Sequence, residues 1–415
     1  MSISLTVSAI IFILIAVRQW LPSAVRIWHI MTLGAVALLA LRQITLKDAF
    51  FAVDWDLILY LFSVFSIASA LYDTGISAQI SRRILSRKNP NTILASYVLI
   101  MAVCAALLTN DAAAVIGVPI ALLMARDMNW GVVPLLILLC ATVTIGSMIS
   151  PVGNPQNILI ANAGQFDNMF LVFAEWIFIP AAITMLLSIL WLKRFLKVDE
   201  PSHNVGIQHR EDNEIAQKWP PLLSAALLVI LIALGSVLHN VEGIYHPTLG
   251  QIGLVACSPI YLASHERRRI LREVDWPTLF FFISMFIVTG SLLKSGSLQF
   301  FLHKSGINLA EPETVTFVSF FASQLFSNVP VVEIYLNLLH EHDTQTLMML
   351  SAISTVAGNL FIISAASNVI VLQQAEKFGV QPFNFWQFFL LMLPVSVISV
   401  AASYLYIIWY SSLQT

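Results

Sequence analysis

Long apolar stretches recur along the chain, and most are about as long as a lipid bilayer's hydrocarbon core is thick. A helix needs roughly 20 consecutive apolar residues to cross that core. The stretches lie at about 4–20, 25–41, 55–75, 132–160, 168–192, 219–238, 247–264, 276–296, 345–372 and 385–410. Because the alternating strands of a membrane barrel are not visible, these stretches predict helices that span a membrane.

The composition agrees with a helical membrane protein and excludes several other classes. Charged residues make up 11% of the 415 residues and hydrophobic residues 58%, whereas soluble domains carry about 25% charged residues. A net charge of -2, without a basic domain, gives no reason to expect a nucleic-acid partner. Cys104, Cys140 and Cys257 lie in apolar stretches with neither disulfide nor metal spacing, so we expect no resident cofactor.

Lysine and arginine residues sort the connections onto two sides of the membrane. Clusters at 82–88, 193–197 and 267–272, together with Arg18 and Arg26, fall on one side if successive spans alternate. The positive-inside rule makes that side the cytoplasm and puts both termini outside, as in a multi-pass protein of the inner (plasma) membrane. We expect these basic residues to set orientation and not to bind a ligand.

The two halves of the sequence resemble each other. "VDWDLILYLFSVFSIASALYDTG" begins at Val53 and "VDWPTLFFFISMFIVTGSLLKSG" begins at Val274, an offset of 274 − 53 = 221. In each half an apolar hairpin with a short polar tip follows, at 91–126 and 313–340, and then an interrupted span. The polar run 195–218 reads as a flexible cytoplasmic linker between a first repeat, 1–194, and a second repeat, 219–415.

Each repeat holds five spans and one hairpin, which constrains the architecture. Because five is odd, the second repeat must enter the membrane upside down relative to the first. The predicted fold class is therefore an all-α polytopic membrane protein of two inverted-topology repeats, each with five transmembrane helices and one re-entrant hairpin, with broken helices at the midplane. Twelve full crossings stay open, because two extra crossings leave the loop charges on the same sides; the short polar tips favour re-entry.

The stretch "SPVGNPQN", residues 150–157, interrupts an otherwise apolar span. Its prolines and glycine break the helix and expose free carbonyl groups at one helix end and free N–H groups at the next. Such ends bind cations and anions, respectively. The second half has "TVAGNLFIISAASN" in the same order, which matches Asn154 to Asn368. The candidate substrate- and ion-binding residues are Thr109, Asn110, Asp111, Ser150, Gly153, Asn154, Asn157, Ser327, Asn328, Gly358, Asn359, Ser364, Ser367 and Asn368.

Asp111 is the strongest of these candidates, since a carboxylate inside a membrane is costly and usually functional. It can be charged with Na⁺ bound, near Asn110 and Asn154, or neutral with a proton bound. The alternative is a simple helix cap at the start of the following segment. Glu333, one turn beyond the second tip, is the next carboxylate to consider. Because no Arg or Lys lies in the broken segments, an anion there would be held by helix ends, hydroxyls and amides.

At "TND" (109–111), "SPVGNPQN" (150–157), "SNVP" (327–330) and "AGNLFIISAASN" (357–368) the chain resembles the ion transporter superfamily. This group includes citrate-transporter-like permeases, divalent anion:sodium symporters and arsenite-efflux permeases. The resemblance covers nearly the whole chain and implies a homodimer with scaffold and transport portions. In sodium-coupled members each tip reads Ser-Asn-Thr; here Val329 lacks the hydroxyl, which puts one of two sodium sites in doubt.

The sequence therefore predicts a secondary active transporter for a small anion, such as a di- or tricarboxylate, coupled to Na⁺ or H⁺. Efflux of arsenite or antimonite, a metalloid substrate, is one alternative, and Na⁺/H⁺ exchange is another. An enzyme is not expected, because the sequence carries no HExxH motif, no membrane-protease motif and no nucleotide-binding loop.

Overall fold

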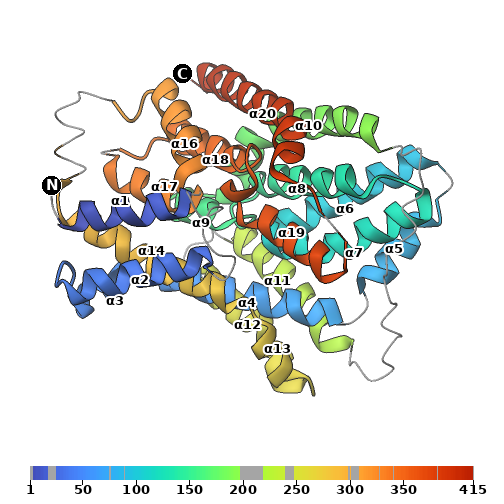
Figure 1. Cartoon of the computed structure of the whole chain (residues 1–415), viewed down its shortest axis with the longest axis horizontal. Helices are drawn as coiled ribbons and strands as arrows, with labels where there is room; N and C mark the ends of the chain where they lie inside the picture. Colours follow the sequence, from blue (N-terminus) through green and yellow to red (C-terminus); the bar gives the residue numbers. More distant parts are fainter. Residues whose placement is uncertain are drawn as a thin grey trace.

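The computed structural model describes residues 3–16, 25–73, 76–87, 89–196, 218–238, 247–297, 300, 308–326, 328–339, 341–380 and 382–414. Every regular element within these ranges is a helix (Figure 1). The predicted linker at 195–218 lies almost entirely outside the described residues, as does Ser327 at the second hairpin tip. The all-helical class predicted from the sequence is confirmed.

The helices of the two halves follow the same order. The first half contains α1 (Ile3–Ala16), α2 (Ile27–Ala40), α3 (Leu46–Ala52), α4 (Trp55–Asp73), α5 (Ile76–Leu85), α6 (Pro90–Leu108), α7 (Asn110–Met128), α8 (Val132–Met148), α9 (Pro155–Gly164) and α10 (Met169–Leu192). The second half contains α11 (Trp219–Leu238), α12 (Leu249–Ala263), α13 (Arg267–Glu273), α14 (Trp276–Lys294), α16 (Pro312–Phe326), α17 (Asn328–Leu338), α18 (Thr344–Ala357), α19 (Ala366–Lys377) and α20 (Phe385–Gln414).

The apolar stretches and both hairpins form helices close to the predicted ranges. By length and composition, α6, α10, α14 and α20 can each cross a membrane within the described residues, and α3 with α4 makes a fifth span bent by 60°. The short helices α3, α5 and α13 were not predicted, because seven to ten residues are too few to distinguish a helix from a loop by their apolar pattern.

Matched hydrogen bonds show that the repeat extends to atomic detail. The bounds of α3 and α4, shifted by 221 residues, become those of α13 and α14. At the elbow between each pair, a tryptophan closes the bend: Trp55 Nε1 donates to the Phe50 carbonyl at 2.9 Å, and Trp276 Nε1 donates to the Leu271 carbonyl at 2.8 Å. Both tryptophans and both carbonyls are related by the same offset of 221.

The packing of the helices is reciprocal between the halves. Helix α4 packs against α12, and its counterpart α14 packs against α2; likewise α9 packs against α17, and α19 against α7. Each half therefore makes with the other half the same contacts that it receives from it, as expected of two halves related by a pseudo-two-fold axis. That the axis lies in the plane of a membrane, which would invert one repeat, stays a prediction.

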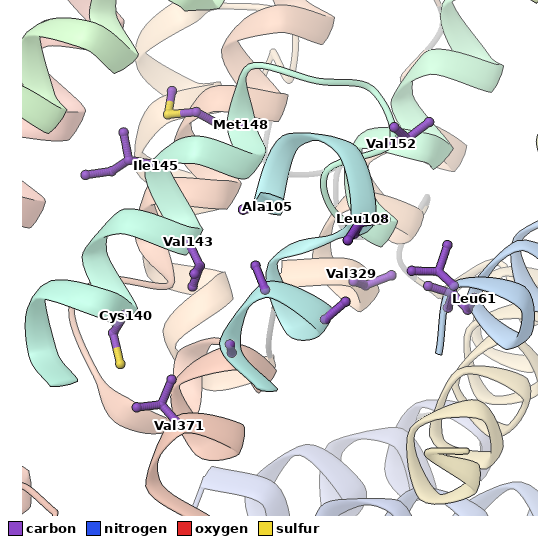
Figure 2. Close-up of a cluster of buried hydrophobic side chains, with 14 of the residues drawn as sticks. Leu61, Ala105, Leu108, Cys140, Val143, Ile145, Met148, Val152, Val329 and Val371 are labelled. Carbon is purple, nitrogen blue, oxygen red and sulfur yellow. The ribbon is translucent and has the colours of Figure 1, made fainter. Parts of the chain in front are cut away.

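The interior and the surface of the helical assembly are both rich in apolar residues. Helices α8 and α18 are buried along nearly their whole length, whereas outer helices expose large aliphatic side chains such as Leu186 (57%) and Leu405 (66%). This pattern suits a lipid surround. Figure 2 shows buried side chains around the first hairpin, contributed by Leu61, Ala105, Leu108, Cys140, Val143, Ile145, Met148, Val152, Val329 and Val371.

Candidate functional site

The tip of the first hairpin meets the break in the first interrupted span. Thr109 joins α6 to α7 with a φ of 100°, an uncommon conformation for a β-branched residue. Its hydroxyl accepts from Ala112 N at 3.3 Å and so caps α7. The neighbouring Asn110 N donates to the Gly153 carbonyl at 2.9 Å. The hairpin therefore turns back at the level of the break between α8 and α9.

Side chains of the break hold it in one conformation. Asn154 caps α9 by accepting from Asn157 N at 3.0 Å. The Asn157 side chain turns back and donates to the Ser150 carbonyl at 2.9 Å. Gly153 is required here, because an added Cβ would lie 2.1 Å from the Ser147 carbonyl oxygen. The interruption is therefore a specific, tightly packed turn.

The second hairpin meets the second break through a glutamine that the sequence did not single out. Gln324, near the end of α16, donates to the Ala357 carbonyl at 2.9 Å and accepts from the Ser364 hydroxyl at 2.6 Å. Asn328, the first residue of α17, lies beside Gly358. Asn368 closes this break by donating to the Gly358 carbonyl at 2.7 Å.

These contacts correct the predicted pairing of asparagines. Asn368 was matched to Asn154, but its hydrogen bonds to the carbonyls of Gly358 and Phe361 repeat those of Asn157 to Ser147 and Ser150. All three residues are related by an offset of 211. The counterpart of Asn154 is Ala365, the N-cap of α19, which has no capping side chain.

A hydrogen-bond network joins the two breaks across the halves. The Ser351 hydroxyl of α18 donates to Asn157 Oδ1 at 2.8 Å. Thr355, one turn later, accepts from Asn154 Nδ2 at 3.3 Å and from Gln156 Nε2 at 3.4 Å. All five side chains are buried, so the network sits inside the protein and fixes the first break against α18.

A cavity of about 170 Å³ lies between the two hairpin tips. Of the predicted site residues, Asn110, Asp111 and Asn328 line it. Six polar or charged residues that were not predicted also line it: Arg26, Gln156, Asp275, Thr278, Gln324 and Gln373. They come from five different helices or their caps, and only Gln156 lies within a motif that the sequence analysis identified.

Asp111 is the most deeply buried of the charged residues that line the cavity. It is 4% exposed, and its Oδ1 has no hydrogen-bond partner among the described residues. Thr109, and not Asp111, caps α7, so capping does not explain the carboxylate. The side-chain oxygen of Asn328, at the other tip, is likewise buried and without a partner within the described ranges. Both tips thus present an unused acceptor.

The remaining predicted residues shape the site without lining the cavity. They build the turns and caps of the two breaks, and they are Thr109, Ser150, Gly153, Asn154, Asn157, Gly358, Asn359, Ser364, Ser367 and Asn368. Within the part of the chain that the structure describes, Asn359 and Ser367 are fully buried and their side chains find no partner. Glu333 is outside the cavity and accepts from Asn337 at 3.0 Å.

Arg26, one of the basic residues that the sequence analysis expected only to set orientation, also lines the cavity. It stands at the N-cap of α2 and lines both the 170 Å³ cavity and a second cavity of about 480 Å³. Asp111 and Asp275 line both cavities as well. The wider cavity extends to Arg269 and Glu273 of the basic helix α13, so a polar passage leads from the tips toward that side.

No group of three or more histidine, cysteine or carboxylate side chains that could hold a metal ion occurs in the described ranges. A transition-metal site at the tips is therefore not indicated for those residues. The oxygen donors of Asp111, Asn110 and Asn328 are of the hard kind that alkali and alkaline-earth cations prefer.

Known membrane proteins match this chain over nearly their full length. A 46 kDa membrane protein of Mycobacterium leprae is 28% identical over 90% of this chain and 91% of its own. Inner membrane protein YbiR of Escherichia coli is 27% identical over 86% and 88%. The silicon efflux transporter LSI3 of Oryza sativa subsp. japonica is 22% identical over 89% and 90%.

A solved structure shows the same fold. The YdaH transporter of Alcanivorax borkumensis matches with a TM-score of 0.51 at 14% identity, over 85% of this chain and 84% of that one. The pattern that defines the citrate transporter family matches residues 10–343. The resemblance drawn from the hairpin tips and broken spans is thereby confirmed, as is the expectation of a transporter and not an enzyme. The chain belongs to the citrate transporter family.

Proposed function

We propose that this transporter carries a small anion, that Asp111 couples its transport to Na⁺ or H⁺, and that it works in the inner (plasma) membrane. The observation that carries the proposal is the buried Asp111 carboxylate, whose Oδ1 is unpartnered among the described residues and which faces a cavity shared by both hairpin tips. A buried charge without a partner is unstable, so Asp111 must bind a cation or a proton whenever the cavity is closed to water.

The coupling follows from electrostatic repulsion between two negative charges. An anion entering the cavity approaches Asp111 and is repelled until a proton or Na⁺ neutralises that carboxylate. Binding of the cation therefore raises the affinity for the anion, and by linkage the anion raises the affinity for the cation by the same factor. A carrier that moves only when both sites are filled uses the cation gradient to drive the anion.

The Asp111→Asn variant tests this proposal, because it keeps the size of the side chain and removes its charge. We expect the variant, reconstituted in liposomes, to lose the dependence of anion uptake on the Na⁺ or pH gradient. The fold should persist, since Thr109 supplies the cap of α7. Glu313→Gln, at an exposed position bonded to Tyr404, is the matched control. Unaltered ion dependence in Asp111→Asn would move the coupling site elsewhere, with Glu333 the next residue to test.

A second candidate function is efflux of a neutral hydroxy-metalloid such as arsenite or antimonite. It is favoured by one relative, which is named a silicon efflux transporter, and by the neutral amides of Gln156 and Gln324 in the cavity. Release of preloaded arsenite or silicic acid from the same liposomes, without uptake of any anion, would favour this function. Na⁺/H⁺ exchange in the absence of both substrates would favour the antiporter alternative.

The inner-membrane location and a homodimer are further parts of the proposal. One relative is named an inner membrane protein, which supports the location. The homodimer rests on the resemblance alone. Cell fractionation checks the first, and light scattering of the purified protein in detergent checks the second.

A further inference from the structure

We infer that the anion is a monocarboxylate with a flat apolar body, held at its charged end by Arg26 and along its body by Trp28 and Phe281. The inference rests on the proposed function, anion transport, and narrows it to a substrate class. It differs from the di- or tricarboxylate suggested by the sequence, because the described residues that line the cavity include one cationic side chain and many apolar ones.

The cavity has an extensive apolar lining. It includes the aromatic side chains of Trp28, Phe281 and Phe282 and the aliphatic side chains of Ile15, Val329 and Ile370. Trp28 and Phe281 are only half-buried, so part of each ring is open to a ligand. Val329 occupies the position in the second tip that Asp111 occupies in the first, an offset of 218 shared by Asn110 and Asn328. One tip is thus charged and the other apolar.

The charges of the cavity favour one carboxylate and not several. Asp275 already accepts from Thr278 N at 3.2 Å and from the Thr278 hydroxyl at 2.7 Å, as the N-cap of α14. Asp111 is reserved for the coupling cation. Arg26 forms no ion pair with any described residue, so its guanidinium remains for one carboxylate, which it can bind through two parallel hydrogen bonds. A second or third carboxylate would meet no further cationic side chain among the described residues that line this cavity.

The volume fits the same class. An apolar cavity of about 150 Å³ is enough to hold benzene, and this cavity measures about 170 Å³. A single ring with one carboxylate therefore fits within it, with the ring against Trp28 and the carboxylate at Arg26, where the second cavity begins. Stacking on aromatic side chains favours flat bodies over branched, hydroxylated ones.

The test measures thermal stabilisation of the purified full chain by four compounds, since a ligand that binds only the native state raises the unfolding temperature. The compounds are benzoate, acetate, benzylamine and citrate, each titrated at fixed pH with saturating Na⁺. We expect benzoate to bind at least tenfold more tightly than the other three. Arg26→Gln should weaken benzoate and acetate about tenfold, whereas Trp28→Leu should weaken benzoate alone, and Trp28→Phe should restore it.

Arg83→Gln and Trp409→Leu are the matched controls, because both side chains are exposed and lie outside the cavity; benzoate binding should be unchanged in both. Tighter binding of citrate than of benzoate, insensitive to Trp28→Leu, would overturn this inference and leave anion transport standing. Binding of benzylamine in place of benzoate would overturn both. Anion uptake that depends on Asp111, with no stabilisation by benzoate, would overturn the substrate class alone.

Discussion

Single residues decide whether the first break can form at all, and Gly153 is the clearest case. A Cβ at this position would lie 2.1 Å from the Ser147 carbonyl oxygen, which belongs to the backbone and cannot rotate away. We predict that Gly153→Ala destabilises the protein by about 1–3 kcal/mol, the range for overpacked interiors. The measurement is the unfolding temperature in detergent. Gly235→Ala is the control, since an added Cβ there would lie 3.6 Å from its nearest neighbour, Ile252 Cδ1. Equal stability of the two variants would contradict the prediction.

The asparagines that close the breaks should behave as a symmetric pair. Asn157 and Asn368 each donate to backbone carbonyls of their own break, at 2.9 Å and 2.7 Å. Removing either side chain leaves a buried carbonyl unsatisfied, which costs about 1–3 kcal/mol. We predict a similar loss of stability in Asn157→Ala and Asn368→Ala, measured by thermal unfolding, with the exposed Asn91→Ala as control. A large loss in only one variant would argue against their equivalence.

The hairpin tips and the breaks could be predicted from the sequence. Which of their residues line the cavity and which only close the breaks could not. Asn154 and Asn157 are both asparagines three residues apart, so the sequence alone can pair Asn368 with either one. Only the hydrogen bonds to the carbonyls of each break show that Asn157 is its counterpart. Arg26 could not be predicted either, because it reaches the cavity only through the packing of α2 against α14. Because Arg26 lies outside every motif, no pattern in the neighbouring sequence indicates that it lines the cavity.

At the scale of elements, the elbows between short and long helices repeat with the same hydrogen bond. We predict that Trp55→Phe and Trp276→Phe each lower stability by about 0.5–1.5 kcal/mol, the usual contribution of one hydrogen bond. Phenylalanine keeps most of the ring and removes the donor to Phe50 or Leu271. Thermal unfolding measures the effect, and Trp409→Phe, an exposed tryptophan near the end of α20, is the control. Unchanged stability in both elbow variants would show that the bends hold without the bond.

The long helices themselves follow from apolar runs, which is why their bounds agree with the predicted ranges to within a few residues. The three short helices α3, α5 and α13 do not follow from apolar runs. A helix this short is stabilised mainly by packing on its neighbours and only weakly by its own helix propensity. Helix α5 packs on α7 and α13 packs on α4. Two of these helices carry the basic residues that set the predicted orientation.

The whole molecule should place its two ends on the same side of the membrane. This prediction rests on the positive-inside rule, which puts the basic helices α5 and α13 in the cytoplasm and both ends outside. We predict that Ser412→Cys is labelled by an impermeant thiol reagent from outside and Arg272→Cys only from the cytoplasm. Cys140 and Cys257 are buried and Cys104 is half-buried, so a Cys104→Ser background suits the assay. Outside labelling of Arg272→Cys would reverse the assigned orientation.

The pseudo-two-fold relation is also broken beside the wide cavity. Ser69 lines the wide cavity, and its counterpart 221 residues later, Gly290, is packed so closely that an added Cβ would lie 2.8 Å from Ala52 Cβ. At this matched pair of positions, the first half borders a cavity and the second half packs α14 against α3.

The single carboxylate at the first tip has a consequence for voltage. A monoanion that travels with one Na⁺ or one proton on Asp111 carries no net charge across the membrane. A membrane potential does about 2.3 kcal/mol of work per elementary charge per 100 mV, and none on a neutral complex. We predict that a potassium diffusion potential set with valinomycin leaves the initial rate of uptake unchanged, while a gradient of the coupling ion still drives accumulation. A cell would then power this carrier from chemical gradients alone, even when its membrane is depolarised.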